Sequence, residues 1–447
     1  MGDTPLSRRT FLSAAGVAGI AGLAGPLLSA CGTSGPAGGK GGGKNLQVWV
    51  LQDEGQNPIQ QAAIDDFNKT SSTKLKLVPT ASSGSSGYTD KLRIGMGSPN
   101  PPDLIFNWGT GSIQDYAQSG RLVDLTSQLN SDATWKNSFL PSVLDAGKAD
   151  GKYYGIPLRG MQPVLIFYNK TLFAQQGQQP PATYDDLLKL VTYFDSKKIQ
   201  PFALGHVDAW PNLMWLEYLV DRIGGPTVFA GILQNVLAGK PGGWGQPAML
   251  DSLRRIQDLV DRRAFGTNFA SVNYVNDGAG LLFAKGKAAM HLMGTWEESN
   301  QVDKHPDFAK KDLSFAPFPT VAGGKGDPNS VVGNPTNYFS ISSKSADVAA
   351  ATAFLKKEMA DPMYVDKLIK AGDVPAVSGL ESRLSASPNP EFAKYVYQMV
   401  QKAPSFTLSW DQALPHQFTD PLHSNLQKVF LKKMSPEQFV QAMDAVK

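Results

Sequence analysis

Cysteine is almost absent from this chain: its 447 residues include one, Cys31. A single cysteine excludes an internal disulfide, a four-cysteine zinc site and a Cys-x-x-Cys redox motif. Strong charge of one sign is also missing, because 42 Lys and Arg residues oppose 39 Asp and Glu residues. A net charge of +3 is too small to predict a nucleic-acid-binding surface.

Common catalytic and metal-binding signatures are missing as well. The chain contains no G-x-S-x-G, H-E-x-x-H or EF-hand loop. His416 and His423 are too far apart for a metal pair one helical turn apart, and no carboxylate signature surrounds them. We therefore expect two or three globular units without a metal or cofactor.

The first thirty residues have the pattern of an export signal. Arg8 and Arg9 precede an uncharged run over residues 10–30 that ends in small residues. The paired arginines favour the twin-arginine route, which carries folded proteins across the membrane. An uncleaved transmembrane helix is the alternative reading of so long an uncharged run. Four glycines and a proline within the run weaken that helix.

Cys31 lies in the segment Leu28-Ser29-Ala30-Cys31-Gly32, which resembles a bacterial lipoprotein box. The resemblance implies cleavage before Cys31 and attachment of acyl chains, palmitate among them, to a reactive thiol. We therefore expect an extracytoplasmic protein held at the cell membrane by a lipid anchor. Residues 31–44 form a Gly-rich tether. Part of this tether mimics a P-loop, but Asn45 replaces the required Ser or Thr and no strand precedes it, so nucleotide binding is not expected.

Strand and helix patterns alternate from residue 45 onward. The first set comprises strands at 46–51, 75–78 and 102–106 and helices at 58–68 and 88–96. This succession predicts a parallel sheet with right-handed crossovers. The pattern then restarts, with strands at 165–168, 201–204 and 288–293 and helices at 184–196, 213–222, 247–263 and 278–285.

Later segments are expected to cross between the two units. Strand patterns at 313–317 and 338–342 could return to the first sheet, and helices at 346–359 and from 362 onward complete the chain. Two α/β units joined by such crossings leave a cleft between them, and clefts between domains are preferred ligand sites.

Several short segments stand in a specific order along the mature chain. They are Val48-Trp49-Val50 with Asp53-Glu54, Pro102–Phe106 leading to Tyr116–Gly120, Asp150–Pro157, Tyr168–Phe173, Gly286–Met290 with Gly294-Thr295-Trp296, and Ser435–Gln438. Together they resemble the substrate-binding lipoproteins of ABC sugar importers, the maltose-binding-protein-like group. The resemblance implies the two-lobe, type II periplasmic-binding-protein fold, with hinge crossovers and a ligand cleft between the lobes. By analogy, one lobe is 45–156 plus 314–358 and the other 157–313 plus 359–447.

Side chains that could hold a sugar follow the predicted strands. Aromatic rings cover the apolar faces of a pyranose, and planar polar groups bind its hydroxyls. Asn107 and Trp108 follow the strand at 102–106, at the end where open α/β sheets bind ligands. Trp296 matches a family stacking position by its Gly-x-Trp pattern. The other expected ligand contacts are Asp53, Glu54, Tyr88, Arg159, Gln162, His206, Asp208, Trp210, Asn337, Trp410 and Asp411, with Asn334 a weaker candidate.

Structural readings compete with these functional ones. Each tryptophan could pack in a core, as we expect of Trp49 and Trp215. Asp53 and Glu54 could be a helix N-terminal charge cluster, and a lone histidine such as His206 is more often structural.

The resemblance implies a non-catalytic receptor that captures a neutral di- or oligosaccharide and presents it to ABC permease subunits. A receptor for another solute, such as an oligopeptide, is one alternative. A secreted polysaccharide hydrolase is another. The hydrolase needs two converging carboxylates, for which Glu297 and Glu298 are candidates, although a solvated helix start explains them as well.

Overall fold

The computed structural model describes residues 45–80 and 87–446. The export signal, the lipidated Cys31 and the tether predicted for residues 1–44 lie outside the described residues. Within the described ranges, no helix combines the length and apolar character needed to cross a bilayer.

The first sheet has five strands in the order β2-β1-β3-β12-β6. Their bounds are β1 Asn45–Leu51, β2 Lys74–Thr80, β3 Leu104–Asn107, β6 Ile156–Pro157 and β12 Tyr338–Ile341. β1 pairs in parallel with β2 and β3, as the alternating pattern predicted, while β12 runs antiparallel to β3 and β6.

The second sheet follows the order β13-β11-β7-β9-β8, with β10 also paired to β7. Their bounds are β7 Gln162–Asn169, β8 Gln200–Ala203, β9 Ala288–Gly294, β10 Leu313–Ala316, β11 Val331–Asn334 and β13 Phe406–Leu408. β7 and β9 lie at the centre and are buried over nearly their whole length, which explains their continuous apolar sequences. A separate two-stranded ribbon joins β4 Lys148–Ala149 to β5 Lys152–Tyr153.

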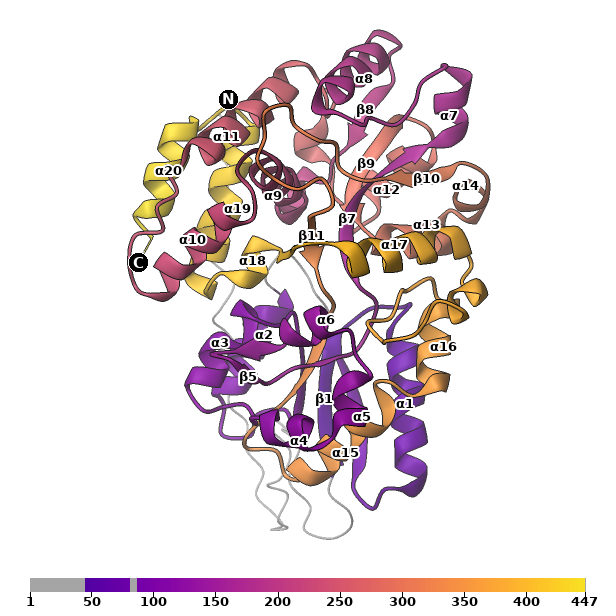
Figure 1. Cartoon of the computed structure of the whole chain (residues 1–447), viewed down its shortest axis with the longest axis vertical. Coiled ribbons are helices and arrows are strands. Elements are labelled where there is room, and N and C mark those ends of the chain that lie inside the picture. The colour runs from indigo at the N-terminus through magenta and orange to yellow at the C-terminus, as the bar shows by residue number, and fades with distance from the viewer. Residues whose placement is uncertain (1–44, 81–86, 447) are drawn as a thin grey trace, which may run out of the picture. The chain divides into compact units, whose positions relative to one another are not determined.

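Helices flank both sheets (Figure 1). The helices between β1 and β6, together with two late ones, are α1 Asn57–Thr70, α2 Gly87–Gly97, α3 Gly111–Gln118, α4 Thr126–Ser131, α5 Ala133–Asn137, α6 Pro141–Asp145, α15 Val348–Glu358 and α16 Pro362–Lys370. The helices that follow β7 are α7 Lys170–Gln175, α8 Tyr184–Ser196, α9 Trp210–Gly224, α10 Thr227–Leu237, α11 Pro247–Asp261, α12 Gly278–Ala284, α13 Trp296–Lys304 and α14 Pro306–Lys311. The C-terminal helices are α17 Pro390–Lys402, α18 Trp410–Ala413, α19 His416–Phe430 and α20 Pro436–Asp444; short 3-10 turns are η1 His206–Asp208, η2 Phe269–Ser271 and η3 Arg383–Ala386.

Two hydrophobic cores correspond to the two sheets. The chain passes from the first sheet to the second between β6 and β7, and returns between β11 and β12. α16 lies at the boundary, because its Tyr364 and Leu368 pack in the first core while its Val365 and Ile369 pack in the second. The described chain is therefore a two-lobe α/β protein in which separate segments of sequence build each lobe.

One strand prediction is wrong. The strand at 313–317 was expected to return to the first sheet, but β10 pairs antiparallel with β7 in the second. An apolar pattern predicts a strand but does not predict which sheet the strand joins. In this structure β10 pairs with the edge of β7 that β9 leaves open. β11 also joins the second sheet, although the predicted lobe boundaries would place it in the first. The boundaries themselves remain a prediction.

Candidate functional site

Three aromatic rings gather beside the carboxyl ends of β8 and β9. Trp210 begins α9, Trp296 begins α13, and Tyr274 lies in the loop before α12. The Trp210 ring meets Tyr274 edge to face at 5.1 Å between centroids and Trp296 at 6.0 Å. All three remain partly exposed. These rings, which we call the aromatic cluster, offer apolar faces and edges to a ligand.

Local backbone geometry holds Trp210 and Tyr274 in place. Ala209, directly before Trp210, has a φ of 64°, a conformation that side-chain-bearing residues rarely adopt and that is enriched at functional sites. The Asp208 carboxylate accepts hydrogen bonds from the backbone N–H groups of Tyr274 and Val275. Asp208 was predicted as a ligand contact, and in this structure its carboxylate anchors the loop that carries Tyr274.

A buried polar network lies behind the aromatic cluster. The Tyr274 hydroxyl donates to Glu297 Oε2 at 2.9 Å and accepts from Asn300 Nδ2 at 2.8 Å. Glu297 Oε1 lies 3.3 Å from His291 Nδ1 and accepts from Gln301 Nε2 at 2.7 Å. Burial alone would raise the pKa of Glu297, but His291 and these hydrogen bonds outweigh burial and lower it. Glu297 is thus an ionised acceptor that orients Tyr274.

Arg159 forms a second cluster where the chain crosses between the sheets. Its Nη1 lies 3.3 Å from Asp53 Oδ2, and its Nη2 lies 3.3 Å from Asp373 Oδ1. Gln56 Nε2 donates to Asp373 Oδ2 at 3.1 Å. Burial disfavours the guanidinium charge, but the two carboxylates more than offset this and raise the pKa of Arg159. These four residues, the hinge ion cluster, join the segment after β6 to the residues just before α1 and just after α16.

The predicted residues of the first lobe divide into exposed and buried groups. Trp108 is partly exposed and packs edge to face against Phe106 and Tyr88. Tyr88 is buried and donates its hydroxyl to the Phe106 carbonyl at 2.9 Å. Asn107 is buried and bonds Ser340 Oγ and the Gly109 N–H. Glu54 is exposed beside Asp53. Tyr88 and Asn107 therefore position Trp108 and present no free polar group in this structure.

Some of the described buried polar atoms without partners lie near the crossings between the lobes, while others, such as Trp215 Nε1, lie inside a lobe. Within the described residues, Asn334 Oδ1, Asn337 Nδ2, Gln56 Oε1 and Glu298 Oε2 have no hydrogen-bond partner. Such atoms are normally paired, so these four are candidates for hydrogen bonds to a ligand. Gln162 is buried on β7 opposite Asn334. Burial raises the pKa of Glu298 to about 7, and the nearby Asp373 adds to the rise.

The hinge ion cluster and the aromatic cluster are connected. Glu298 lies two residues after Trp296, and a Cβ atom placed on Gly372 would lie 2.9 Å from Glu298 Oε2. Gly372 directly precedes Asp373. Thr295, which precedes Trp296, donates its hydroxyl to the Met161 carbonyl near Arg159. The start of α13 therefore lies against the hinge.

Three other predicted contacts lie inside the second lobe. His206 is buried, bonds Asn212 Oδ1 at 3.0 Å, and has a pKa lowered by burial. Trp410 is 1% exposed and stacks on Phe229 at 4.5 Å. Asp411 lies 3.1 Å from His423 Nε2. His206 and Trp410 thus pack in the structure as the alternative structural reading describes. Trp215 is fully buried as expected, whereas Trp49, also expected in a core, is only partly buried.

Three residues of these clusters, Gln56, Tyr274 and Asp373, were missed in the sequence. Tyr274 and Asp373 lie in loops that carry no strand-end signal, and contacts with Asp208 and Arg159, distant in sequence, define their positions. Among the described residues, no group of three His, Cys, Asp or Glu side chains could hold a metal ion.

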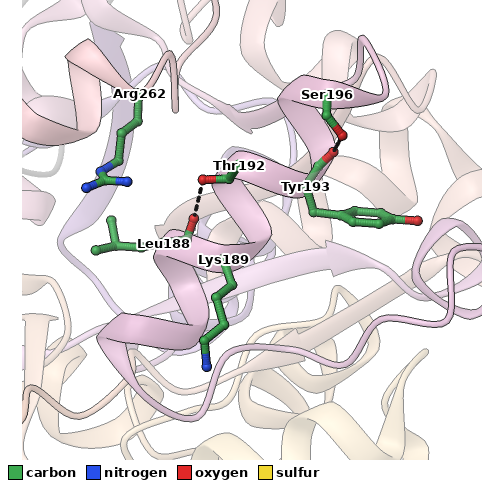
Figure 2. Close-up of a pocket in the computed structure, with 6 residues that line it drawn as sticks. All are labelled: Leu188, Lys189, Thr192, Tyr193, Ser196 and Arg262. Carbon is green, nitrogen blue, oxygen red and sulfur yellow. Dashed lines mark hydrogen bonds between the residues drawn. The ribbon is translucent and has the colours of Figure 1, made fainter.

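Two surface cavities lie away from all these residues. Figure 2 shows one of about 510 Å³, lined by Leu188, Lys189, Thr192, Tyr193 and Ser196 of α8 and by Arg262 after α11. The hydroxyls of Thr192 and Ser196 bond carbonyls of their own helix. The other cavity, of about 320 Å³, lies among Tyr218, Arg222, Phe318 and several prolines. Neither cavity includes a predicted ligand contact.

Comparisons with known proteins agree with this architecture. The family described as bacterial extracellular solute-binding protein matches residues 52–357, more than half of the chain. An uncharacterised ABC transporter extracellular-binding protein of Pyrococcus horikoshii is 27% identical over 49% of this chain and 48% of its own length. The multiple sugar-binding protein of Streptococcus mutans is 25% identical over 74% of each chain.

Coverage is wider among solved structures. A chitin oligosaccharide binding protein is 25% identical, with a TM-score of 0.79 over 91% of this chain and 98% of its own. By contrast, this chain spans about half the length of the first curated relatives that it matches. The family match and the two-lobe architecture lead to one conclusion: the chain belongs to the bacterial extracellular solute-binding protein family.

Proposed function

We propose that this protein is the extracytoplasmic receptor of an ABC importer and binds a neutral di- or oligosaccharide between its two lobes. The aromatic cluster carries the proposal, because three partly exposed rings beside a polar network suit the alternating apolar faces and hydroxyls of a sugar. The names of the Streptococcus mutans relative and of the chitin oligosaccharide binding protein support this substrate class. ABC permease subunits would be the partners, and no nucleic acid is involved.

In the proposed site, Trp210, Tyr274 and Trp296 provide the rings of one lobe and Trp108 provides a ring of the other. Asn334, Asn337 and Glu298 would bind hydroxyls with the atoms that lack partners among the described residues. The predicted lobes, 45–156 plus 314–358 and 157–313 plus 359–447, would close by bending at the crossings, with β10 and β11 reassigned to the second lobe.

Replacement of Trp296 by Ala should weaken saccharide binding by about 30-fold, the effect of losing roughly 2 kcal/mol at a binding hot spot. Trp296→Phe should retain most of the affinity, because a ring remains. Isothermal titration calorimetry measures both. Ile94→Ala is the control, since Ile94 lies on α2 with 68% of its surface exposed. Equal affinity in Trp296→Ala and the native protein would remove the aromatic cluster from the site.

Charge pairing favours a neutral ligand over an oligopeptide. A peptide receptor needs free charges for the peptide ends, but the Arg159 guanidinium is already paired with Asp53 and Asp373.

The burial of the two candidate carboxylates supports a non-catalytic role. Glu297 and Glu298 are 1% and 2% exposed, and Glu297 is committed to three side chains, whereas a hydrolase needs two carboxylates facing its substrate.

The proposal includes a lipid anchor at Cys31, after export through the twin-arginine route and removal of residues 1–30. Two acyl chains supply the two signals that stable membrane attachment needs. The native protein should incorporate labelled palmitate and lose residues 1–30, as measured by metabolic labelling and by the mass of the purified protein, and Cys31→Ser should abolish the incorporation. A native protein that retains residues 1–30 and takes up no palmitate would favour the uncleaved helix instead.

A further inference from the structure

A close contact joins the two lobes at the start of α3. Gly111, the first residue of α3, packs directly against the backbone of α18. A Cβ atom on Gly111 would overlap the carbonyl group of Ala413 and lie 2.7 Å from the Gln412 oxygen. Ile113 of α3 belongs to the first core and Ala413 to the second. Only glycine at position 111 therefore allows α3 and α18 to approach this closely.

The α3 side of this contact is fixed by an unusual backbone. Thr110 has a φ of 33°, which is rare for a β-branched residue. Its N–H and hydroxyl both donate to the Ala146 carbonyl, at 3.0 and 3.1 Å. Strained residues of this kind persist where the surroundings hold them and are enriched at sites that bind or switch. Trp108 lies three residues before Gly111, so the same loop carries a ring of the proposed sugar site.

Hydrogen bonds and a ring stack hold the α18 side of the contact in place. Glu217 of α9 accepts hydrogen bonds from the Ser409 hydroxyl at 2.8 Å and from the Trp410 N–H at 2.7 Å. The Trp410 ring stacks on Phe229, and Asp411 lies 3.1 Å from His423. Both sides of the contact are thus rigid, so a displacement at Gly111 would be passed on to the lobes and not absorbed locally.

We propose that the Gly111–Ala413 contact is a latch that forms when the lobes close and that sets the population of the closed state. The inference rests on the proposed function, because closure around a ligand is what the latch would stabilise. Affinity for a ligand that binds the closed state scales with the fraction of molecules in that state. The latch therefore tunes affinity from a position that need not touch the ligand.

The test is Gly111→Ala, with Gly97→Ala as the matched control. Gly97 also lies on a helix of the first lobe, and a Cβ atom there would meet nothing within 4 Å. Spin labels at the exposed Gln118 of α3 and Gln417 of α19, in the full chain carrying Cys31→Ser, report the separation of the lobes by pulsed electron resonance. Gly111→Ala should lengthen this separation and raise the saccharide Kd by about tenfold or more. Gly97→Ala should change neither quantity.

Unfolding measurements separate a latch from ordinary packing. Each lobe keeps its own core, so Gly111→Ala should unfold at the native temperature when no ligand is bound. A large fall in Tm, or an unchanged separation together with unchanged affinity, would overturn the latch. If no saccharide binds the native chain but Gly111→Ala still lengthens the separation, the latch stands and the proposed ligand class fails.

Discussion

Arg159→Met should destabilise the protein by about 3–5 kcal/mol, the cost of removing one partner from a buried ion pair. The side chain of Asp373 is 6% exposed and that of Arg159 is 10% exposed. Without the guanidinium, the Asp373 carboxylate would keep the Gln56 amide and the Gly160 N–H as donors but no positive partner. Urea unfolding followed by circular dichroism measures the loss.

A shorter ion pair on the surface provides the control. Arg254 Nη2 lies 2.7 Å from Glu437 Oε1, but the two side chains are 59% and 54% exposed. Arg254→Met should therefore cost less than about 1 kcal/mol. Adding Asp373→Asn to Arg159→Met should recover part of the loss, because the uncompensated charge disappears. Equal losses of stability in Arg159→Met and Arg254→Met would contradict a buried hinge ion cluster.

Glu217→Gln should flatten the pH dependence of stability between pH 4.5 and 8. Glu217 is 1% exposed, and burial, helped by the Asp411 charge, raises its pKa from 4.5 to about 8. Below pH 4.5 the carboxyl is protonated in both states. As the pH rises, the unfolded chain ionises first, so the stability contributed by Glu217 falls by about 1.4 kcal/mol per pH unit until the folded group ionises near pH 8.

Gln can accept the bonds from Ser409 and Trp410 without carrying a charge. Relative to the native protein, the variant should therefore gain roughly 3 kcal/mol of stability between pH 4.5 and pH 7. Glu298, with a pKa of about 7, contributes a similar fall in stability in both proteins, but its contribution ends near pH 7. Unfolding curves at several pH values test this, with the exposed Glu437→Gln as control. Parallel pH profiles for the native protein and Glu217→Gln would contradict a neutral Glu217.

Element positions could be predicted from sequence wherever local signals agreed. The helix predicted at 184–196 has the bounds of α8, because the Thr183–Asp186 capping box and an amphipathic repeat coincide. The partner of β10 could not be predicted, since both sheets have open edges. The same limit applies to the lobe boundaries, which depend on contacts between segments far apart in sequence.

Site residues were harder to predict, because exposure is decided by distant partners. Trp410 lies between Ser409 and Asp411, a polar setting typical of a surface residue. Glu217, almost two hundred residues earlier, accepts bonds from this segment and draws Trp410 into the core. No sequence pattern around Tyr274 predicted a role for it, yet hydrogen bonds to Asp208 and Glu297 hold it beside Trp210. Trp210 and Trp296 were predicted as ligand contacts because they follow the strands at 201–204 and 288–293, and Trp296 also because its Gly-x-Trp pattern resembles the family's; both stay predictions.

The most direct measurement is a thermal-shift screen of residues 32–447 against neutral mono- and oligosaccharides, with oligopeptides in the same panel. A ligand at about 100 times its Kd adds roughly 2.7 kcal/mol of stability and should raise Tm by about 3 °C in a chain of this length. One saccharide series should give this shift, and Trp296→Ala should reduce it to about a third, because a Kd weaker by about 30-fold leaves roughly 0.9 kcal/mol of stabilisation at the same ligand concentration. A shift with peptides or other solutes, and none with any saccharide, would contradict the proposed function while leaving the fold intact.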